Sequence, residues 1–144
     1  MVDVHAVTDE QERADALDVR HDVFVEEQGV DEDLEYDEHE DEAVHFVAYD
    51  GNEAVGAARL REYEDDVGKI ERVAVLEPRR GDGIGRELIR TVEERARTLG
   101  FGTLLLHSQT RADDFYRQLG YERYGETFEK AGISHVEMRK SLAN

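Results

Sequence analysis

The chain has 144 residues, 36 acidic against 18 basic side chains, a formal net charge of −18 and no cysteine. This length suits one domain with a single core, the charge disfavours nucleic-acid binding, and the lack of cysteine excludes disulfides and thiolate chemistry. No apolar run approaches the roughly 18 residues of a membrane span, and residues 1–5, MVDVH, lack a signal-peptide pattern. We therefore expect a cytoplasmic protein without a membrane partner.

The acidic charge is concentrated in the first half of the chain. Residues 1–72 carry 25 acidic and 6 basic side chains, whereas residues 73–144 carry 11 acidic and 12 basic ones. An acidic surface is typical of halophilic proteins, because at about 1 M salt the Debye length falls to about 3 Å and distant carboxylates scarcely repel one another. The alternative is that the two halves differ in function, so that the basic half binds an anion and the acidic half faces a cation.

Turn and apolar patterns predict the elements of the first half. The segment Thr8-Asp9-Glu10-Gln11 has the form of a capping box, in which Thr8 accepts from the amide of Gln11. The helix that follows is predicted to end near Gly29, and the acidic segment 31–42 is predicted to be a loop. Strands are predicted over residues 2–7, 43–49, 54–61 and 67–76.

The second half contains the strongest helix prediction, over residues 83–99. An apolar stripe runs along it, and Gly100 follows where a C-cap glycine belongs. A buried strand over 101–106, a helix over 111–119 and strands over 121–124 and 135–139 complete the chain. The order β α β β β α β α β β predicts one mixed α/β domain over residues 1–144. The apolar stripe consists of Ile84, Leu88, Ile89, Val92, Ala96 and Leu99.

Residues 80–85, RGDGIG, lie between a predicted strand and this helix. Three glycines in five residues let the backbone amides curve inward, and the helix N-terminus adds a positive end. With Arg79, Arg80 and Arg86 around the turn, the sequence predicts an anion site of pyrophosphate size. A P-loop would need Lys and Ser or Thr after Gly85, and a dinucleotide fold would need a glycine at position 86; neither is present.

The motif Arg80-x-x-Gly83-x-Gly85 resembles the acyl-CoA signature R/Q-x-x-G-x-G/A of the GNAT superfamily of N-acetyltransferases. Residues 71–75, ERVAV, resemble the central strand of that family, and residues 115–121, FYRQLGY, resemble its later helix–strand motif. Residues 20–28 and 132–138 resemble the ElaA-like branch. The resemblance implies a mostly antiparallel sheet, flanked by helices and splayed at its central strand.

The resemblance also implies acetyl-CoA as co-substrate, without a metal. The pantetheine arm would pair with the backbone of Val73, Ala74 and Val75, and the amide of Val75 would polarise the thioester carbonyl. Gln109 stands where many relatives have an asparagine that bonds the cofactor. The diphosphate would be held by the turn and helix start, at Arg80, Gly81, Asp82, Gly83, Ile84, Gly85 and Arg86.

For catalysis, Tyr116 matches the family tyrosine near the sulfur, where a phenol that is protonated at neutral pH can protonate the departing thiolate. Glu71 is the predicted general base, because on a regular strand it shares a face with Val73 and Val75. The rival bases are Glu26, Glu27, Glu129 and His135. Acceptor binding is assigned to Glu26, Glu27, Gln28 and His135.

We therefore predict direct transfer of an acetyl group to a small-molecule or peptide amine in a ternary complex. Ser108 lies outside a G-x-S-x-G elbow, so no covalent acyl-enzyme is implied. A non-catalytic acyl-CoA-binding regulatory domain and an acylhomoserine-lactone synthase-like enzyme remain alternatives. A calcium loop is not predicted over 31–42, because Tyr36 stands where glycine is needed. The six histidines show no metal-ligand spacing, and a homodimer stays open.

Overall fold

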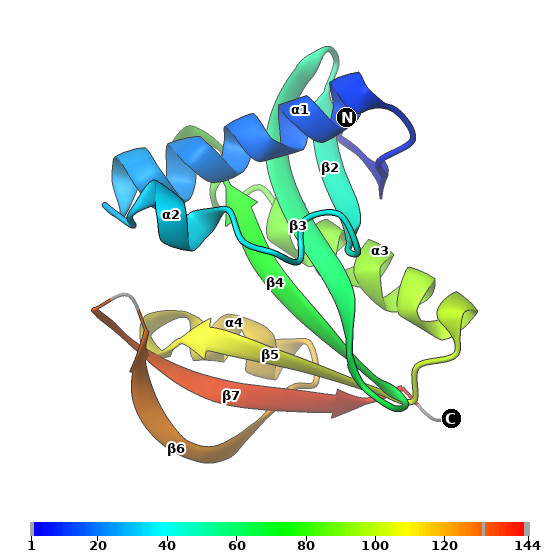
Figure 1. Ribbon diagram of the computed structural model, residues 1–144, viewed down its shortest axis with the longest axis vertical. Coiled ribbons are helices and arrows are strands. Elements are labelled where there is room, and N and C mark those ends of the chain that lie inside the picture. Colours follow the sequence, from blue (N-terminus) through cyan, green and yellow to red (C-terminus); the bar gives the residue numbers. More distant parts are fainter. Residues whose placement is uncertain (1, 131, 143–144) are drawn as a thin grey trace.

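The computed structural model describes residues 2–130 and 132–142, which form a seven-stranded sheet with helices on both faces (Figure 1). Neighbouring strands are antiparallel except for β4 and β5, which are parallel. This confirms the predicted mixed and mostly antiparallel sheet. Across the sheet the order is β1 (Val2–Ala6), β2 (Val44–Asp50), β3 (Glu53–Glu64), β4 (Val67–Val75), β5 (Thr103–Gln109), β7 (Ile133–Ser141) and β6 (Glu122–Lys130).

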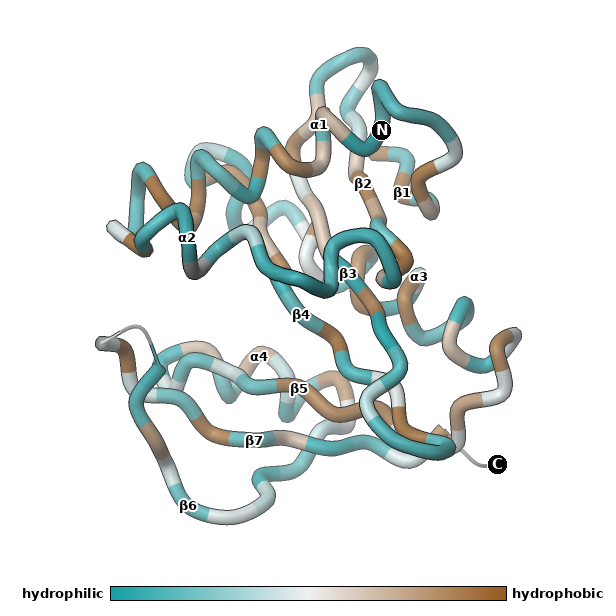
Figure 2. The backbone as a smooth tube through the Cα atoms, viewed as in Figure 1, coloured by the Kyte–Doolittle hydropathy of each residue, from teal (hydrophilic) through white to brown (hydrophobic). Residues whose placement is uncertain are grey.

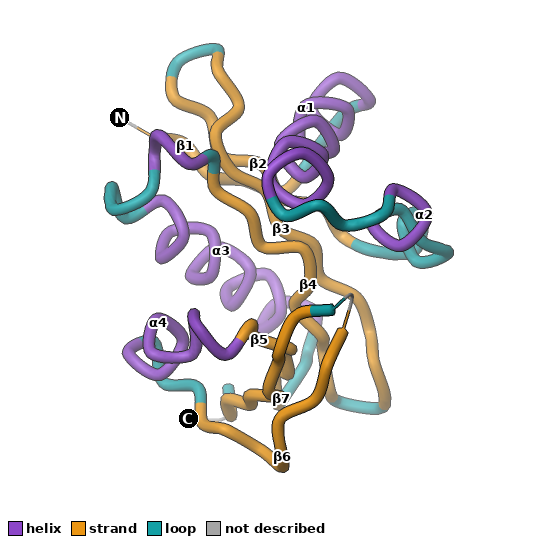
Figure 3. The backbone as a smooth tube through the Cα atoms, turned by 90° about the vertical axis from the view of Figure 1, so that its left-hand side faces the viewer, coloured by secondary structure: helices purple, strands orange, loops and turns teal. Residues whose placement is uncertain are grey.

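Two groups of helices cover the sheet from opposite sides, as Figure 3 shows. The first half of the chain supplies one group and the second half supplies the other, so the sheet separates the helices of the acidic half from those of the second half. The first group is α1 (Glu10–Arg20), the π-helical segment η1 (His21–Glu27) and α2 (Glu32–Glu35). The second group is η2 (Glu77–Arg79), α3 (Ile84–Leu99), η3 (Thr110–Ala112) and α4 (Asp113–Gln118).

The larger core lies between the sheet and α3. Five members of the predicted stripe are buried there, whereas Leu99 in the last helical turn is 50% exposed. A smaller core joins α1 to the opposite face through Ala16, Val19 and Ala57. In Figure 2, hydrophobic residues gather on the strands, whereas the segment between α2 and β2 is mostly hydrophilic. Among the described residues, no helix is long and apolar enough to cross a membrane.

Strands β4 and β5 pair only from Val67 opposite Thr103 to Ile70 opposite Leu106, and then separate. Just beyond this point β4 contains a bulge, because its pairing with β3 shifts by one residue between Glu71 and Ala74. Arg72 lies in this bulge with a φ of 57°, an uncommon conformation for a residue other than glycine. The predicted splay at the central strand is therefore present.

Three local predictions need correction. Asp9, not Thr8, is the N-cap of α1 and accepts from the amide of Glu12, while the Thr8 amide and hydroxyl donate to the Glu12 carboxylate. The N-cap is thus one residue later than predicted, and the Glu12 carboxylate bonds Thr8 and not the N-cap amide. The acidic segment 31–42 contains the short helix α2. Strand β6 spans Glu122–Lys130 and is longer than the predicted strand over 121–124. The sequence does not indicate its full length, because an exposed edge strand lacks an apolar alternation.

Candidate active site

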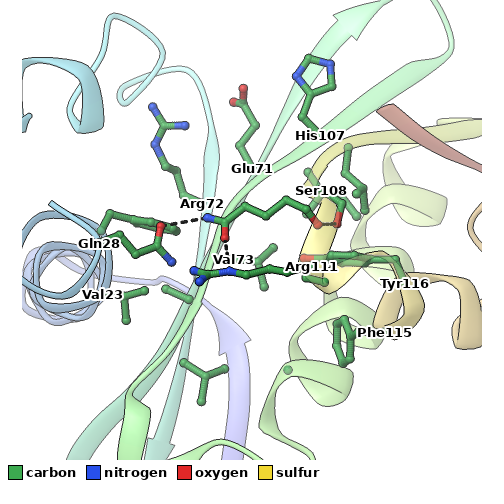
Figure 4. A pocket seen from close by; sticks show the side chains of 18 of the residues that line it. Val23, Gln28, Glu71, Arg72, Val73, His107, Ser108, Arg111, Phe115 and Tyr116 are labelled. Carbon is green, nitrogen blue, oxygen red and sulfur yellow. Dashed lines mark hydrogen bonds between the residues drawn. The ribbon is translucent and has the colours of Figure 1, made fainter. Parts of the chain in front are cut away.

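A cavity of about 910 Å³ opens where β4 and β5 separate. It is lined by η1, the end of α2, most of β4, the glycine-rich turn, β5, α4, the last residue of β6 and the start of β7 (Figure 4). Of the predicted site residues, Glu26, Asp82 and Glu129 do not line it. The cavity brings together Glu27, Gln28, Glu71, Val73, Ala74, Val75, Arg80, Gly81, Gly83, Ile84, Gly85, Arg86, Gln109, Tyr116 and His135.

The glycine-rich turn leaves the start of α3 open to this cavity. Gly81 and Gly83 have φ values of 91° and 84°, which L side chains rarely adopt, and a Cβ at either position would meet no atom within 4 Å. Gly83 is the N-cap of α3, and no side chain caps the first helical amides. A Cβ on Gly85 would lie 3.1 Å from the Phe115 ring, so the start of α3 packs closely against that ring. The uncapped amides are suited to an anion.

Two of the three arginines around the turn already have carboxylate partners. Arg79 lies 2.9 Å from Asp50 and 3.3 Å from Asp82, whereas Arg80 donates two hydrogen bonds of 2.7 Å to Glu27. The Arg80 hydrogen bonds lower the pKa of Glu27, which keeps it ionised. Arg86 is exposed and has no ion pair with any residue that the structure describes. The side-chain charge left for an anion is therefore smaller than the sequence suggests, and the backbone amides gain importance.

The end of β4 presents free backbone toward the cavity. The Leu76 amide donates to the Val55 carbonyl at 3.0 Å. Because backbone groups alternate between the two edges of a strand, the amide and carbonyl of Val75 face away from β3, toward the splay. Arg80 Nε donates to the Val75 carbonyl at 3.0 Å. The Val75 amide is thus directed toward the side of β4 where the cavity opens.

Tyr116 and Phe115 of α4 form the wall opposite η1 (Figure 4). The two rings pack edge to face, with centroids 4.9 Å apart. Tyr116 is buried, and its hydroxyl has no hydrogen-bond partner among the described residues. Burial raises the Tyr116 pKa above its ordinary value, so the phenol stays protonated at neutral pH. A hydrogen-bond donor thus faces the cavity.

Glu71 lies in surroundings that disfavour the predicted base role. Burial alone would raise its pKa, but Arg61, Arg59 and Lys69 lie 2.8, 2.7 and 3.1 Å away and hold the pKa well below its usual range. A carboxylate held in this way is a poor proton acceptor.

The expectation that Glu71 shares a face with Val73 and Val75 is wrong. The bulge at Arg72 adds one residue to β4 and reverses the alternation of its side chains. Val73 and Val75 pack with the α3 core, while Glu71 lies on the opposite face with Arg59. Figure 4 shows Glu71 and His107 pointing away from Phe115 and Tyr116.

Gln109 connects the two walls of the splay. Its amide nitrogen donates to the Gln28 side chain at 2.9 Å, and its oxygen accepts from Arg111 Nε at 2.8 Å (Figure 4). Gln28 is the C-cap of η1. The predicted acceptor residue Gln28 and the predicted cofactor residue Gln109 are therefore direct partners, and both line the cavity.

Two histidines line the cavity on the Glu71 side. His135 Nδ1 lies 2.7 Å from the Ile133 carbonyl, which can only accept, so Nδ1 carries a proton and Nε2 holds the lone pair of the neutral ring. Burial lowers the His135 pKa. Burial, with help from Lys69 and Lys130, lowers the His107 pKa to about 4. Both rings are neutral at pH 7.

A buried ion network lies behind the Glu71 side of the cavity. Arg20 binds Glu35 and Glu40 at 2.9 and 2.7 Å, and Arg59 binds Asp37 through two hydrogen bonds of 2.8 Å. The acidic segment 31–42 is thus an anchored structure and not only a solvated loop. The network comprises the cations Arg20, Arg59, Arg61, Lys69 and Arg72 and the carboxylates Glu35, Asp37, Glu40 and Glu71.

Sequence reasoning missed several residues that line the cavity. Lys69, Arg72 and His107 interrupt otherwise apolar strands, VGKIERVAV and LLLHSQ, and this interruption is the signal that could have marked them. Lys130 in the exposed edge strand carries no such signal. Within the described ranges no three His, Asp or Glu side chains gather in a group that could hold a metal ion.

Residues 5–142 match the family model described as an acetyltransferase (GNAT) domain, so the chain belongs to the GNAT family of acetyltransferases. It is 42% identical over 132 residues to the uncharacterized N-acetyltransferase YjcF of Bacillus subtilis, covering 91% of this chain and 94% of YjcF. A crystal structure of a candidate N-acetyltransferase from Lactobacillus plantarum superposes with a TM-score of 0.92, 30% identity and 99% of each chain covered.

The relationship to ElaA is also confirmed. The chain is 29% identical over 130 residues to ElaA of Escherichia coli, covering 88% of this chain and 85% of ElaA. The ElaA crystal structure has a TM-score of 0.86, with 97% of this chain and 99% of that chain covered. The predicted superfamily and its ElaA-like relatives therefore stand.

Proposed function

We propose that the protein transfers an acetyl group from acetyl-CoA to an amine, directly and in a ternary complex. The observation that carries this proposal is that the uncapped start of α3 and the splayed edge of β4 open into the same cavity. The first feature suits a diphosphate, and the second suits an extended arm that pairs with a strand edge. Membership of the GNAT family supports the same chemistry.

The end of the cavity at α3 and α4 would bind the donor. Backbone amides from Gly81 to Arg86 suit the diphosphate, and the free edge of Val73–Val75 suits the pantetheine arm. The Val75 amide would donate to the thioester oxygen as negative charge develops there. Rate enhancement would come mainly from orientation and from polarisation of this carbonyl.

The attacking amine must lose a proton, and we assign its removal to His135. The lone pair on its Nε2 makes a neutral imidazole the better proton acceptor than Glu71, whose carboxylate is held by three cations. Tyr116 would donate a hydrogen bond to the departing sulfur. Its raised pKa favours hydrogen-bond donation over complete proton transfer to a thiolate, whose reference pKa is about 8.5.

A calorimetric titration with acetyl-CoA tests the donor site. Gly83→Asp places a carboxylate at the N-cap, so it should weaken binding by roughly 10- to 100-fold through repulsion of the diphosphate. Gly83→Asn is the matched control, because it has the same shape and tolerates a positive φ equally well but carries no charge. Equal affinities for the two folded variants would reject a diphosphate at this turn.

Turnover separates an enzyme from a non-catalytic acyl-CoA-binding domain. The release of free CoA thiol in the presence of an amine panel should depend on both the amine and acetyl-CoA. Binding of acetyl-CoA without amine-dependent release would support the regulatory alternative.

We propose that this reaction takes place in the cytoplasm of a cell with a high internal salt concentration. The support for this is compositional: the chain carries 36 acidic residues, only 3 of its 18 basic residues are lysines, and it lacks cysteine. Activity that rises between low salt and about 1 M KCl is the expected result, because screening weakens repulsion between the surface carboxylates.

A further inference from the structure

We infer that the amine acceptor carries a carboxylate, which binds at the end of the cavity that Lys69, Arg72 and Lys130 line. This inference rests on the proposed acetyl transfer and names the chemical class of its second substrate. It reverses the simplest expectation for a chain with a net charge of −18, which would be a cationic acceptor.

The carboxylates at this end are already bound by arginines from behind. Glu71 contacts Arg59 and Arg61, and Glu35 contacts Arg20. These three arginines do not line the cavity, whereas Glu35 and Glu71 do. The ion network as a whole holds five cations and four carboxylates, so it carries one net positive charge and its carboxylates are not available to attract a cationic acceptor.

Lys130 adds a further positive charge from the opposite wall. It makes no ion pair with any residue in the described ranges. Lys69, Arg72 and Lys130 all line the same cavity, and partial burial, with help from the charges of Lys69 and Arg72, lowers the pKa of Lys130. Lys130 remains exposed, so its ammonium is accessible to an anion that enters the cavity and can pair with that anion.

These cations are not placed to serve the diphosphate of the donor. Glu71, whose carboxylate Lys69 binds, points away from Phe115 and Tyr116, which lie beside the start of α3 (Figure 4). Arg72 is held on the α2 side by Glu35 and Asp37. The anion in question therefore belongs to the acceptor. A diamine or polyamine without a carboxylate would be repelled from the same place.

A matched acceptor panel tests this inference. Each α-amino acid or ω-amino acid is compared with its own carboxamide, which keeps the amine and the chain length but removes the negative charge. With wild-type protein we expect kcat/KM to be at least about tenfold higher for the carboxylates. Lys130→Gln should bring this ratio close to one, mainly by raising KM for the carboxylates, and Lys130→Arg should restore it.

Arg95→Gln is the control for loss of one positive charge. Arg95 is exposed on α3, and the substitution changes the net charge by the same amount as Lys130→Gln. It should leave the ratio unchanged. A ratio that falls equally in both variants would show only long-range steering and would overturn the assignment of Lys130.

The outcomes also separate this inference from the proposed function. If carboxamides or diamines are acetylated as well as the carboxylates, the inference fails and acetyl transfer stands. The inference also fails on its own if acetyl-CoA binds and no carboxylate-bearing amine is acetylated. If the wild-type protein does not bind acetyl-CoA at all, both the proposed function and the inference fail.

Discussion

The two ends of the cavity differ in the groups that line them. We name them after their proposed roles: the donor end lies at α3 and α4, and the acceptor end is lined by Lys69, Arg72 and Lys130. At the donor end the groups that face the cavity are mainly backbone amides of a glycine-rich turn, a helix start and a strand edge. At the acceptor end they are long charged side chains, which are held in place by partners on α1, α2 and β3. The donor end therefore depends on the backbone conformation, whereas the acceptor end depends on buried ion pairs.

This difference predicts different responses to substitution. Removal of one side chain at the donor end should leave the amides in place and affect chemistry alone. Removal of one buried ion at the acceptor end leaves its partners unpaired in a low-dielectric site, and this costs stability before it affects chemistry. Arg80 combines the two kinds of structure, because it pairs with Glu27 of η1 and also donates to the Val75 carbonyl of the strand edge.

The largest expected effect is loss of stability on Arg59→Met. The Arg59 side chain is 0% exposed and binds Asp37, Glu40 and Glu71 within 3.1 Å. The substitution leaves three carboxylates with fewer partners, so the free energy of unfolding should fall by about 3–5 kcal/mol in urea denaturation.

Arg95→Met on the exposed face of α3 is the control, and its effect should stay within about 0.5 kcal/mol. If Arg59→Met costs no more than this control, the network does not hold the acceptor end in place, and the contrast between the two ends disappears.

The next effect belongs to the donor end, where Tyr116→Phe should slow turnover by about 100-fold. The substitution removes a hydroxyl that has no partner among the described residues, so stability and acetyl-CoA affinity should remain close to those of the wild type. Steady-state kinetics, calorimetry and urea denaturation on the same preparation measure the three quantities. An unchanged kcat would remove Tyr116 from the mechanism, and a large loss of stability would show that the donor end also depends on its side chains.

The same difference explains what could be predicted from the sequence. The donor end follows from local spacing, because glycines at 81 and 83 and an amphipathic helix that begins at Ile84 determine where the amides lie. The acceptor end depends on pairs such as Arg20–Glu35 and Arg59–Asp37, which are 15 and 22 residues apart and lie on different elements. No local pattern selects these partners among the many carboxylates of the chain.

Glu71 shows most clearly what could not be predicted from the sequence. The sequence predicts its strand correctly but places the residue on the wrong face, because the bulge occurs at Arg72 and not at a glycine that would mark it. A single added residue moves the predicted base from beside Val73 and Val75 to the centre of the ion network. The strand register of β4 therefore decides which groups surround Glu71, although the strand itself was predicted correctly.

The smallest expected effect is a pH dependence of stability that comes from Asp37 and Glu40. Between pH 5 and pH 3.5, their contribution to the free energy of unfolding should fall by about 2 kcal/mol. Burial opposes ionisation of Asp37 and Glu40, but Arg59 and Arg20 outweigh it and lower each pKa to about 2. A carboxylate with a depressed native pKa stabilises the fold above its unfolded pKa of about 4, and this contribution is lost as pH falls toward the native value. Stability should therefore decrease on acidification.

Protonation of the other carboxylates relieves repulsion and acts in the opposite direction, so the measurement is a difference made at about 1 M KCl. Wild type is compared with the double variant Asp37→Asn, Glu40→Gln, whose side chains stay neutral at every pH. The advantage of the wild type should be largest near pH 6 and smaller by about 2 kcal/mol at pH 3.5, since protonated carboxyls resemble the amides that replace them. An advantage that does not change with pH would mean that these ion pairs contribute no net stability, and that packing alone holds the acceptor end.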